Sequence, residues 1–367
     1  MDSRMRAVTS AQQAMQNRHA SGLVEVRSAG SMGKGVFAKR DIPRGMRIID
    51  EDPLFVVFDR PPNEELAEGA FVQDIAAFCQ TARGLPIDKL KELDRLYYDA
   101  SYDSVGDKNR IRDWYVAEGV TDEYGRILSG RNLAYAVVVM ARRYTIFKDN
   151  CARVGVDDTG EDSGLFLLYS RINHSCSPNA HAHYNGTTER LTVHATRDIE
   201  AGEQVFVQYV DNACLPREQR QEQAKKFGFT CVCPTCTADP VPGSLRGRMY
   251  QLEQGIMRYI DNDPDEAVSM PELPSQALSW VEELMGLLQN PAVDLHNSTL
   301  RNAYRAAFKI LLELGDSQKA TEYAQKDLEL TYCMIGTDDT DYLQGVAKDE
   351  GKLKYWFRHL EDLRDIY

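Results

Sequence analysis

Residues 231–236, read Cys-Val-Cys-Pro-Thr-Cys, place three cysteines at a spacing that suits a single metal ion. A structural zinc site is tetrahedral and takes four ligands, so three thiolates leave one position open. The segment Arg171–Asn179, read Arg-Ile-Asn-His-Ser-Cys-Ser-Pro-Asn, offers Cys176 as the fourth ligand, and Cys214 is the rival. A metal ion held by Cys176, Cys231, Cys233 and Cys236 would join two distant segments, which limits the folds open to the chain. A redox switch or unused thiols are the alternatives, but soft thiolates at this spacing favour zinc.

The segment Arg171–Asn179 is predicted to be a turn between strands. Pro178 pushes the residue before it toward extended geometry, so a helix cannot continue through it. Asn173 and His174 offer donors and acceptors at one point of this turn. A lone histidine in a turn usually has only a structural role, but the neighbouring Cys176 favours a functional site here.

Short strands interrupted by Gly and Pro dominate the first 60 residues and return after residue 149, which favours small antiparallel sheets. The expected strands are 23–26, 36–38, 47–50, 54–58, 191–194 and 204–209. Apolar residues at helical spacing predict helices between them, over 64–81, 88–98, 110–118 and 131–147, the last one buried. The fold class is therefore α+β, with a helical insertion in a β domain.

The composition changes at Pro240-Val-Pro-Gly-Ser244, which predicts a linker. A charged helix is expected over 216–227 before it, and helices over 275–289, 300–314, 317–334 and 352–364 after it. The pair formed by 300–314 and 320–330 is similar to one tetratricopeptide-like unit, and a solenoid would need at least three. We therefore expect an all-α C-terminal lobe packed on the β domain.

Four motifs stand in an order typical of one family: Gly33-Lys-Gly-Val-Phe-Ala38, Asn173-His-Ser-Cys176, Gly202-Glu-Gln-Val-Phe-Val-Gln-Tyr209 and Phe229-Thr-Cys-Val-Cys-Pro-Thr-Cys236. Over about residues 22–237, the chain resembles a SET-domain protein lysine methyltransferase. The SMYD-like branch is the most similar, since its late cysteines pair with the cysteine of the Asn-His-Ser-Cys motif. The resemblance implies an N-terminal arm, a SET domain in two halves around a helical insertion, a zinc-stapled post-SET segment and a helical domain. The corresponding ranges are 1–21, 22–60, 61–148, 149–212, 213–239 and 240–367.

The same resemblance implies S-adenosylmethionine as methyl donor and Tyr209 as the catalytic residue. It implies that the cofactor is bound by Gly33, Lys34, Gly35, Asn173, His174, Tyr209 and Phe229. Asn150 and Phe227 would line the channel for the substrate lysine, and the four cysteines would hold one structural zinc ion. Simpler readings exist for several of these residues: the glycines could form only a tight hairpin, and Tyr209, Phe227 and Phe229 could fill a core.

The chain departs from the family pattern at three places. Only Cys79 and Cys151 occur between Gly35 and Cys176, so the zinc-binding MYND finger of the SMYD branch is missing from this stretch. Ala152 stands where a phenylalanine is expected, which bears on how many methyl groups the site can deliver. Phe227 replaces a more usual tyrosine and so lacks its hydroxyl.

Composition narrows the partners and the compartment. The net charge of −13 argues against nucleic acid and favours basic partners, such as a histone tail or another basic protein segment. Residues 240–367 carry 13 Lys and Arg against 22 Asp and Glu, so the C-terminal lobe could steer such a segment or could simply be a solvated acidic surface. The start of the chain has no apolar signal-peptide core and no apolar run is long enough to span a bilayer. With eight cysteines read as ligands and free thiols, we expect a monomer in the cytoplasm or nucleus, neither secreted nor membrane-bound.

Two functions from different classes fit these observations, a protein lysine methyltransferase and a catalytically weak or inactive module that binds partners through its acidic lobe. Methylation of a non-protein amine is a third. The intact Tyr209, Asn173 and His174 favour the first, whereas Ala152 and Phe227 leave room for the second.

Overall fold

The computed structural model describes residues 22–58, 70–99, 104–154, 162–210, 214–238, 245–261, 269–290 and 298–338, with Val293 and Leu295. Contacts divide the chain into unit 1, Met1–Asp50 with Arg171–Thr188 and Thr192–Tyr367, and unit 2, Glu51–Ser170 with Glu189–Leu191. The expected N-terminal arm at 1–21, the linker at 240–244 and the helix at 352–364 lie outside the described residues.

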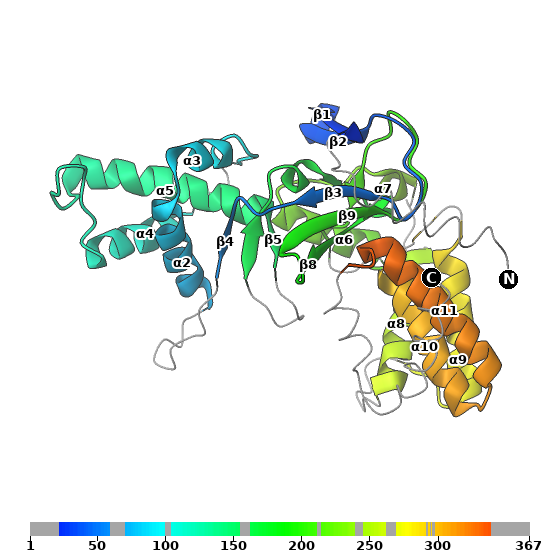
Figure 1. The fold of residues 1–367 in the computed structure, drawn as a ribbon. Coiled ribbons are helices and arrows are strands. Elements are labelled where there is room, and N and C mark those ends of the chain that lie inside the picture. The colour runs from blue at the N-terminus through cyan, green and yellow to red at the C-terminus, as the bar shows by residue number, and fades with distance from the viewer. Residues whose placement is uncertain are drawn as a thin grey trace. The chain divides into compact units, whose positions relative to one another are not determined.

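Unit 1 contains small sheets, as the interrupted strand pattern predicts (Figure 1). Strand β1 (Val24–Ser28) pairs antiparallel with β2 (Lys34–Ala38), and Gly33 between them has φ 76°, a conformation that favours glycine. A three-stranded sheet has the order β3-β9-β8, and β7 and β10 form a pair that is parallel rather than antiparallel. These strands are β3 (Arg47–Glu51), β7 (Asn173–His174), β8 (Ala180–Asn185), β9 (Arg190–Ala195) and β10 (Phe206–Val207).

The strand expected over 204–209 is shorter than predicted, because only Phe206 and Val207 pair as β10. Side chains take two of the main-chain N–H groups of this segment: Phe206 N–H donates to Asn179 and Tyr209 N–H donates to His174. Alternation of apolar residues could not reveal this, since it reports burial and not the identity of the hydrogen-bond partner.

The C-terminal part of unit 1 is helical, as expected. After α6 (Arg217–Lys226) and α7 (Pro234–Ala238), four helices lie side by side (Figure 1): α8 (Leu245–Asp261), α9 (Pro274–Leu288), α10 (Ser298–Glu313) and α11 (Ser317–Ile335). Their apolar faces share one core that includes Leu252, Val281 and Ile310. Helix α11 also packs on β8, and the Cys333 thiol donates a hydrogen bond to the Ala195 carbonyl at 3.4 Å. The lobe therefore contacts the β sheet through α11.

Unit 2 combines the sheet β4-β6-β5 with the helical insertion. Its elements are α2 (Ala70–Gly84), α3 (Ile87–Leu93), α4 (Val105–Ala117), α5 (Gly130–Asn150), β4 (Phe55–Val57), β5 (Cys151–Arg153) and β6 (Ser163–Leu165). Phe78, fully buried, contacts the rings of Phe55, Tyr144 and Phe147. The expectation of a buried helix over 131–147 is wrong in part, because Tyr135 and Val138 on α5 are 73% and 54% exposed. Within the described residues, no helix is long and apolar enough to cross a membrane.

Histidines in unit 1 give its stability a defined dependence on pH. His194 is fully buried and accepts a hydrogen bond from Arg47 Nε at 3.1 Å. Burial, with the nearby Arg47 charge, lowers the pKa of His194 well below its usual value. Burial, with the His183 and Arg301 charges, lowers the pKa of His181 to about 3. Both imidazoles are therefore neutral in the folded protein at every pH near neutrality.

We predict that unit 1 loses stability on acidification below pH 6.5. There the unfolded chain binds protons at His181 and His194 while the folded chain does not, so stability falls until the folded pKa values are reached. His174, whose pKa burial lowers to about 4, acts in the same direction. Three such groups should remove about 4 kcal/mol of unfolding free energy between pH 7.5 and 5.5. Denaturant unfolding of wild type and His194→Gln at both pH values tests this. The variant should lose about 1.4 kcal/mol less than wild type over this range, and equal losses in the two chains would contradict the assignment.

Candidate functional site

The imidazole of His174 connects two parts of unit 1. Its Nδ1 accepts the main-chain N–H of Tyr209 at 2.9 Å, so in the neutral ring the proton is on Nε2. That Nε2 lies 3.4 Å from Cys176 Sγ and donates to it. Burial lowers the pKa of His174 to about 4, which keeps the ring neutral. Both ring nitrogens are thereby used within the protein, so His174 can approach a ligand through its ring face or main chain.

The four cysteines predicted to bind metal do come together. Their sulfur atoms lie within 4.8 Å of one another, and all four residues are buried. Cys176 Sγ is 3.9 Å from Cys231 Sγ and 3.5 Å from Cys236 Sγ. Tetrahedral zinc with bonds of about 2.3 Å sets sulfur atoms about 3.8 Å apart, so this donor set fits such an ion.

The rival ligand Cys214 is outside this group and packs in the core of the helical lobe. Burial raises the pKa of Cys214 to about 12, so it remains a protonated thiol. Sequence spacing left Cys214 open as a ligand because spacing does not show that its side chain is part of an apolar core.

Aromatic rings gather beside the cysteine cluster. The ring of Tyr209 lies 5.6 Å from that of His174, 5.4 Å from that of Phe227 and 6.2 Å from that of Phe229. The Tyr209 hydroxyl donates a hydrogen bond to the Ile172 carbonyl. Phe229 packs against the cysteines and is half-buried, whereas Phe227 is 37% exposed. The structure thus groups His174, Phe227 and Phe229 around Tyr209.

Residues 33–35, the glycine bend, adjoin His174 through its neighbour Asn173. The Asn173 side-chain amide donates to the Lys34 carbonyl at 3.0 Å. Lys34 itself is exposed. A Cβ on Gly35 would stand 2.8 Å from Gln204 Nε2, so Gly35 is a glycine here because the Gln204 side chain packs across it. That packing was not foreseen from the sequence, which offered cofactor binding or a tight hairpin as the reason for the two glycines.

Asn150, expected in the substrate channel, belongs to unit 2, while the other candidate residues belong to unit 1. It is the last residue of α5 and is buried. Its side-chain amide donates to the carbonyls of Ile146 and Tyr97 at 2.7 and 3.1 Å. Within unit 2, this side chain therefore fixes the end of α5 and the turn that contains Tyr97.

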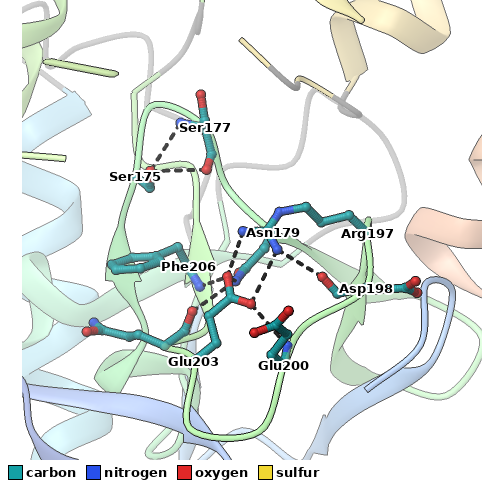
Figure 2. A network of polar contacts seen from close by, with 9 residues as sticks. Ser175, Ser177, Asn179, Arg197, Asp198, Glu200, Glu203 and Phe206 are labelled. Carbon is teal, nitrogen blue, oxygen red and sulfur yellow. Dashed lines mark hydrogen bonds and ion pairs between the residues drawn. The ribbon is translucent and has the colours of Figure 1, made fainter. Parts of the chain in front are cut away.

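Sequence reasoning missed Asn179, which is fully buried. It is the last residue of the segment 171–179, called the central turn here. Figure 2 shows its side chain beside Glu203 and Phe206. The Asn179 amide nitrogen donates to Glu203 Oε1 at 3.0 Å and to the Gln204 carbonyl at 2.9 Å, and its oxygen accepts Phe206 N–H at 2.7 Å. Its position directly after Pro178 was the available signal, since a polar residue closing a turn can take main-chain partners.

An ion pair supports this asparagine. Arg197 donates to Glu203 Oε1 at 2.6 Å, and the Glu200 N–H donates to Glu203 Oε2 at 3.1 Å. Burial acts to raise the pKa of Glu203, but these hydrogen bonds outweigh it and the pKa lies below its usual value. Glu203 is therefore an ionised acceptor at neutral pH and holds the amide of Asn179 in one orientation.

We predict that Asn179→Ala destabilises unit 1 by about 2–4 kcal/mol, because it removes the partner of the Phe206 N–H, the donor to the Gln204 carbonyl and one of the donors to Glu203. Asn109→Ala, at an exposed position of α4, is the matched control and should change stability by less than about 0.5 kcal/mol. Chemical denaturation measures both, and equal effects of the two variants would show that the network carries no stability.

Comparison with known proteins shows similarity over part of the chain. Residues 33–210 match the model of the SET domain. Histone-lysine N-methyltransferase set5 of Schizosaccharomyces pombe is 29% identical over 189 residues, which is 52% of this chain and 56% of that protein. Protein-lysine N-trimethyltransferase SMYD5 of Homo sapiens is 37% identical over 99 residues, 26% of this chain and 23% of that protein. Histone-lysine N-methyltransferase SMYD3 of Mus musculus is 27% identical over 194 residues, 52% of this chain and 42% of that protein.

The chain matches between 23% and 56% of the length of these three relatives. The matched segment contains the glycine bend, the central turn and Tyr209, and the four-cysteine cluster completes the arrangement expected of the SMYD-like branch. Residues 33–210 of this chain are therefore similar to a SET domain, and over part of its length the chain is similar to the SET5 and SMYD proteins.

Proposed function

We propose that the chain is a methyltransferase that moves a methyl group from S-adenosylmethionine to the ε-amine of lysine in a protein substrate. The observation that carries this proposal is the position of Tyr209, whose main chain is held by His174 and whose hydroxyl is held by the Ile172 carbonyl. The SET-domain match and the names of the relatives, histone-lysine and protein-lysine methyltransferases, support it.

The reaction needs a neutral amine aligned with the sulfonium methyl group, and it needs water to be kept away. A free lysine has a pKa of about 10.4, so deprotonation at pH 7 costs about 4–5 kcal/mol. An apolar channel and the positive sulfonium both lower the pKa of the incoming amine. A dedicated general base is then not required, and the displaced proton can leave with water.

Tyr209 would orient the reacting groups. Because its hydroxyl proton points to the Ile172 carbonyl, the lone pairs of the phenolic oxygen remain available as acceptors. Acceptors at this point can bind an N–H of the neutral amine and stabilise the positive charge that the methyl group carries during transfer. The half-exposed Phe227, beside Tyr209, would form part of the lysine channel. For Asn150 we propose a substrate-binding role from the family resemblance alone.

The cofactor would lie where the glycine bend and the central turn meet. We assign its contacts to Gly33, Lys34, Gly35, Asn173, His174, Tyr209 and Phe229, of which Asn173 and Lys34 already contact each other. Lys34, which is exposed, would attract the cofactor carboxylate. The Phe229 ring would stack on the adenine, which its position 5.7 Å from the His174 ring allows.

One structural zinc ion would be held by Cys176, Cys231, Cys233 and Cys236. When bound, zinc stabilises the fold by joining its four thiolates, and a closed site of this kind takes no part in methyl transfer. The residues themselves position Phe229, which packs on the cysteines.

For the substrate, we propose a basic protein segment such as a histone tail. The chain has a net charge of −13, and residues 240–367 are strongly acidic. Negative potential of this kind raises the rate at which basic peptides arrive. We further propose a monomer that acts in the cytoplasm or nucleus.

Incubation with labelled S-adenosylmethionine and a protein extract, followed by mass spectrometry, tests the proposed lysine methylation directly. The proposed activity requires label on protein lysine. Label found only on small amines, or no label in the extract, would contradict the proposal.

We predict that Tyr209→Phe lowers turnover at least about 100-fold, because the acceptor that orients the amine is removed. Affinity for S-adenosylmethionine should change less than about threefold, since the ring remains. Tyr135→Phe, at an exposed position of α5, is the control and should be fully active. Turnover of Tyr209→Phe at the normal rate would show that another residue orients the amine.

Cys233→Ser should lower bound zinc from one ion per chain to a small fraction of one, because three thiolates hold the ion much less tightly than four. Metal content measured by plasma mass spectrometry after gel filtration reads this out. Cys151→Ser, at a half-buried position of unit 2, should keep a full equivalent of zinc. Retention of a full equivalent by Cys233→Ser would contradict the four-cysteine site.

A further inference from the structure

Two arginines are buried beside the four cysteines. Arg220 on α6 is fully buried and Arg246 on α8 is 2% exposed, and they are the two largest buried side chains in the described part of the chain. Removing a guanidinium group from water is costly unless negative charge and hydrogen bonds compensate for it. The presence of two such groups at one place therefore requires a source of negative charge within the protein.

Both guanidinium groups contact the cysteine-bearing segments. Arg220 Nη2 lies 3.7 Å from Cys236 Sγ, and its Nη1 donates to the Leu215 carbonyl. Arg246 Nη2 donates to the Cys176 carbonyl at 3.1 Å and to Ser177 Oγ at 3.0 Å. One arginine therefore touches a sulfur ligand directly, and the other touches the turn that carries another ligand.

The charges of this centre balance in the metal-bound state. Cysteines bind metal as thiolates, so four of them with one divalent zinc ion carry a net charge of −2. Two guanidinium groups carry +2, and the assembly of ion, cysteines and arginines is neutral. Four protonated thiols without the ion would leave two buried positive charges beside neutral sulfur atoms.

Arg246 also connects this centre to the C-terminal lobe. It is in the first turn of α8, and its partner Ser177 donates to the Val293 carbonyl at 2.8 Å. The Thr235 hydroxyl, from the late cysteine segment, lies 2.8 Å from Ser177 Oγ. Ser177 is therefore a junction where the central turn, the late cysteine segment, α8 and the segment at Val293 meet.

We propose that Arg220 and Arg246 are positioning residues that act as the counter-ions of the metal-bound cysteines, and that Arg246 couples metal binding to the attachment of the C-terminal lobe. This inference rests on the metal site proposed above and not on methyl transfer. Zinc would fix Cys176 and the neighbouring Ser177, which Arg246 contacts, so the lobe would be less firmly attached after metal loss.

Zinc affinity of full-length variants tests the proposal. Arg246→Met keeps much of the length of the side chain and removes its charge, and Arg246→Lys keeps the charge. Arg248→Met is the matched control, because Arg248 is on the same helix, is 43% exposed and pairs with Glu283 at the surface. Zinc dissociation constants are measured by competition with a chromogenic chelator, and metal content is measured by plasma mass spectrometry.

We expect Arg246→Met and Arg220→Met to weaken zinc binding at least about tenfold, Arg246→Lys by less than about threefold and Arg248→Met hardly at all. The increase in melting temperature on adding zinc to the chelated protein should be smaller in Arg246→Met than in wild type. A purely structural role would instead lower both melting temperatures equally and leave zinc affinity unchanged, which would overturn the proposal. Wild type that binds no zinc would refute the metal site itself, a result distinct from wild type that binds zinc with unaltered affinity in the variants.

Discussion

The sulfur atom of Cys176 participates in two sets of contacts on which the described site depends. On one side it lies within reach of the sulfur atoms of Cys231 and Cys236, from a segment far along the chain. On the other side it accepts from His174, whose second nitrogen accepts the N–H of Tyr209. The proposed metal ligand and the proposed catalytic tyrosine are therefore connected through one neutral imidazole. A change in the cysteine cluster would reach Tyr209 through two hydrogen bonds.

Side chains, more than strand pairing, hold this region in place. The strands β7 and β10 are only two residues each, and neighbouring N–H groups are satisfied by Asn179 and His174. Buried polar groups of this kind favour a single arrangement when every partner is present and are costly when one is missing. The Arg197–Glu203 pair behind Asn179 has the same character. A site built in this way is rigid before any ligand arrives, which suits a reaction that depends on alignment.

Sequence patterns revealed the elements and the cysteines, and they failed where packing decided the outcome. The spacing of Cys231, Cys233 and Cys236 was sufficient to predict the four-cysteine cluster, because structural zinc requires four ligands and so a fourth cysteine had to be found. Periodicity located the helices α9, α10 and α11 but overstated the burial of α5, since it cannot tell which apolar residues lack a covering partner. The roles of Asn179, Arg220 and Arg246 were invisible, because isolated polar residues carry no pattern. The reason for Gly35 was likewise hidden in its contact with Gln204.

The most direct test of the account is calorimetric titration of the zinc-loaded chain with S-adenosylmethionine, with the metal content of the same sample verified. Saturable binding of one molecule per chain is expected. Binding should be lost when zinc is removed by a chelator, because Phe229 packs on the cysteines that the metal would hold. The absence of heat from a sample that contains one zinc ion per chain would contradict the account.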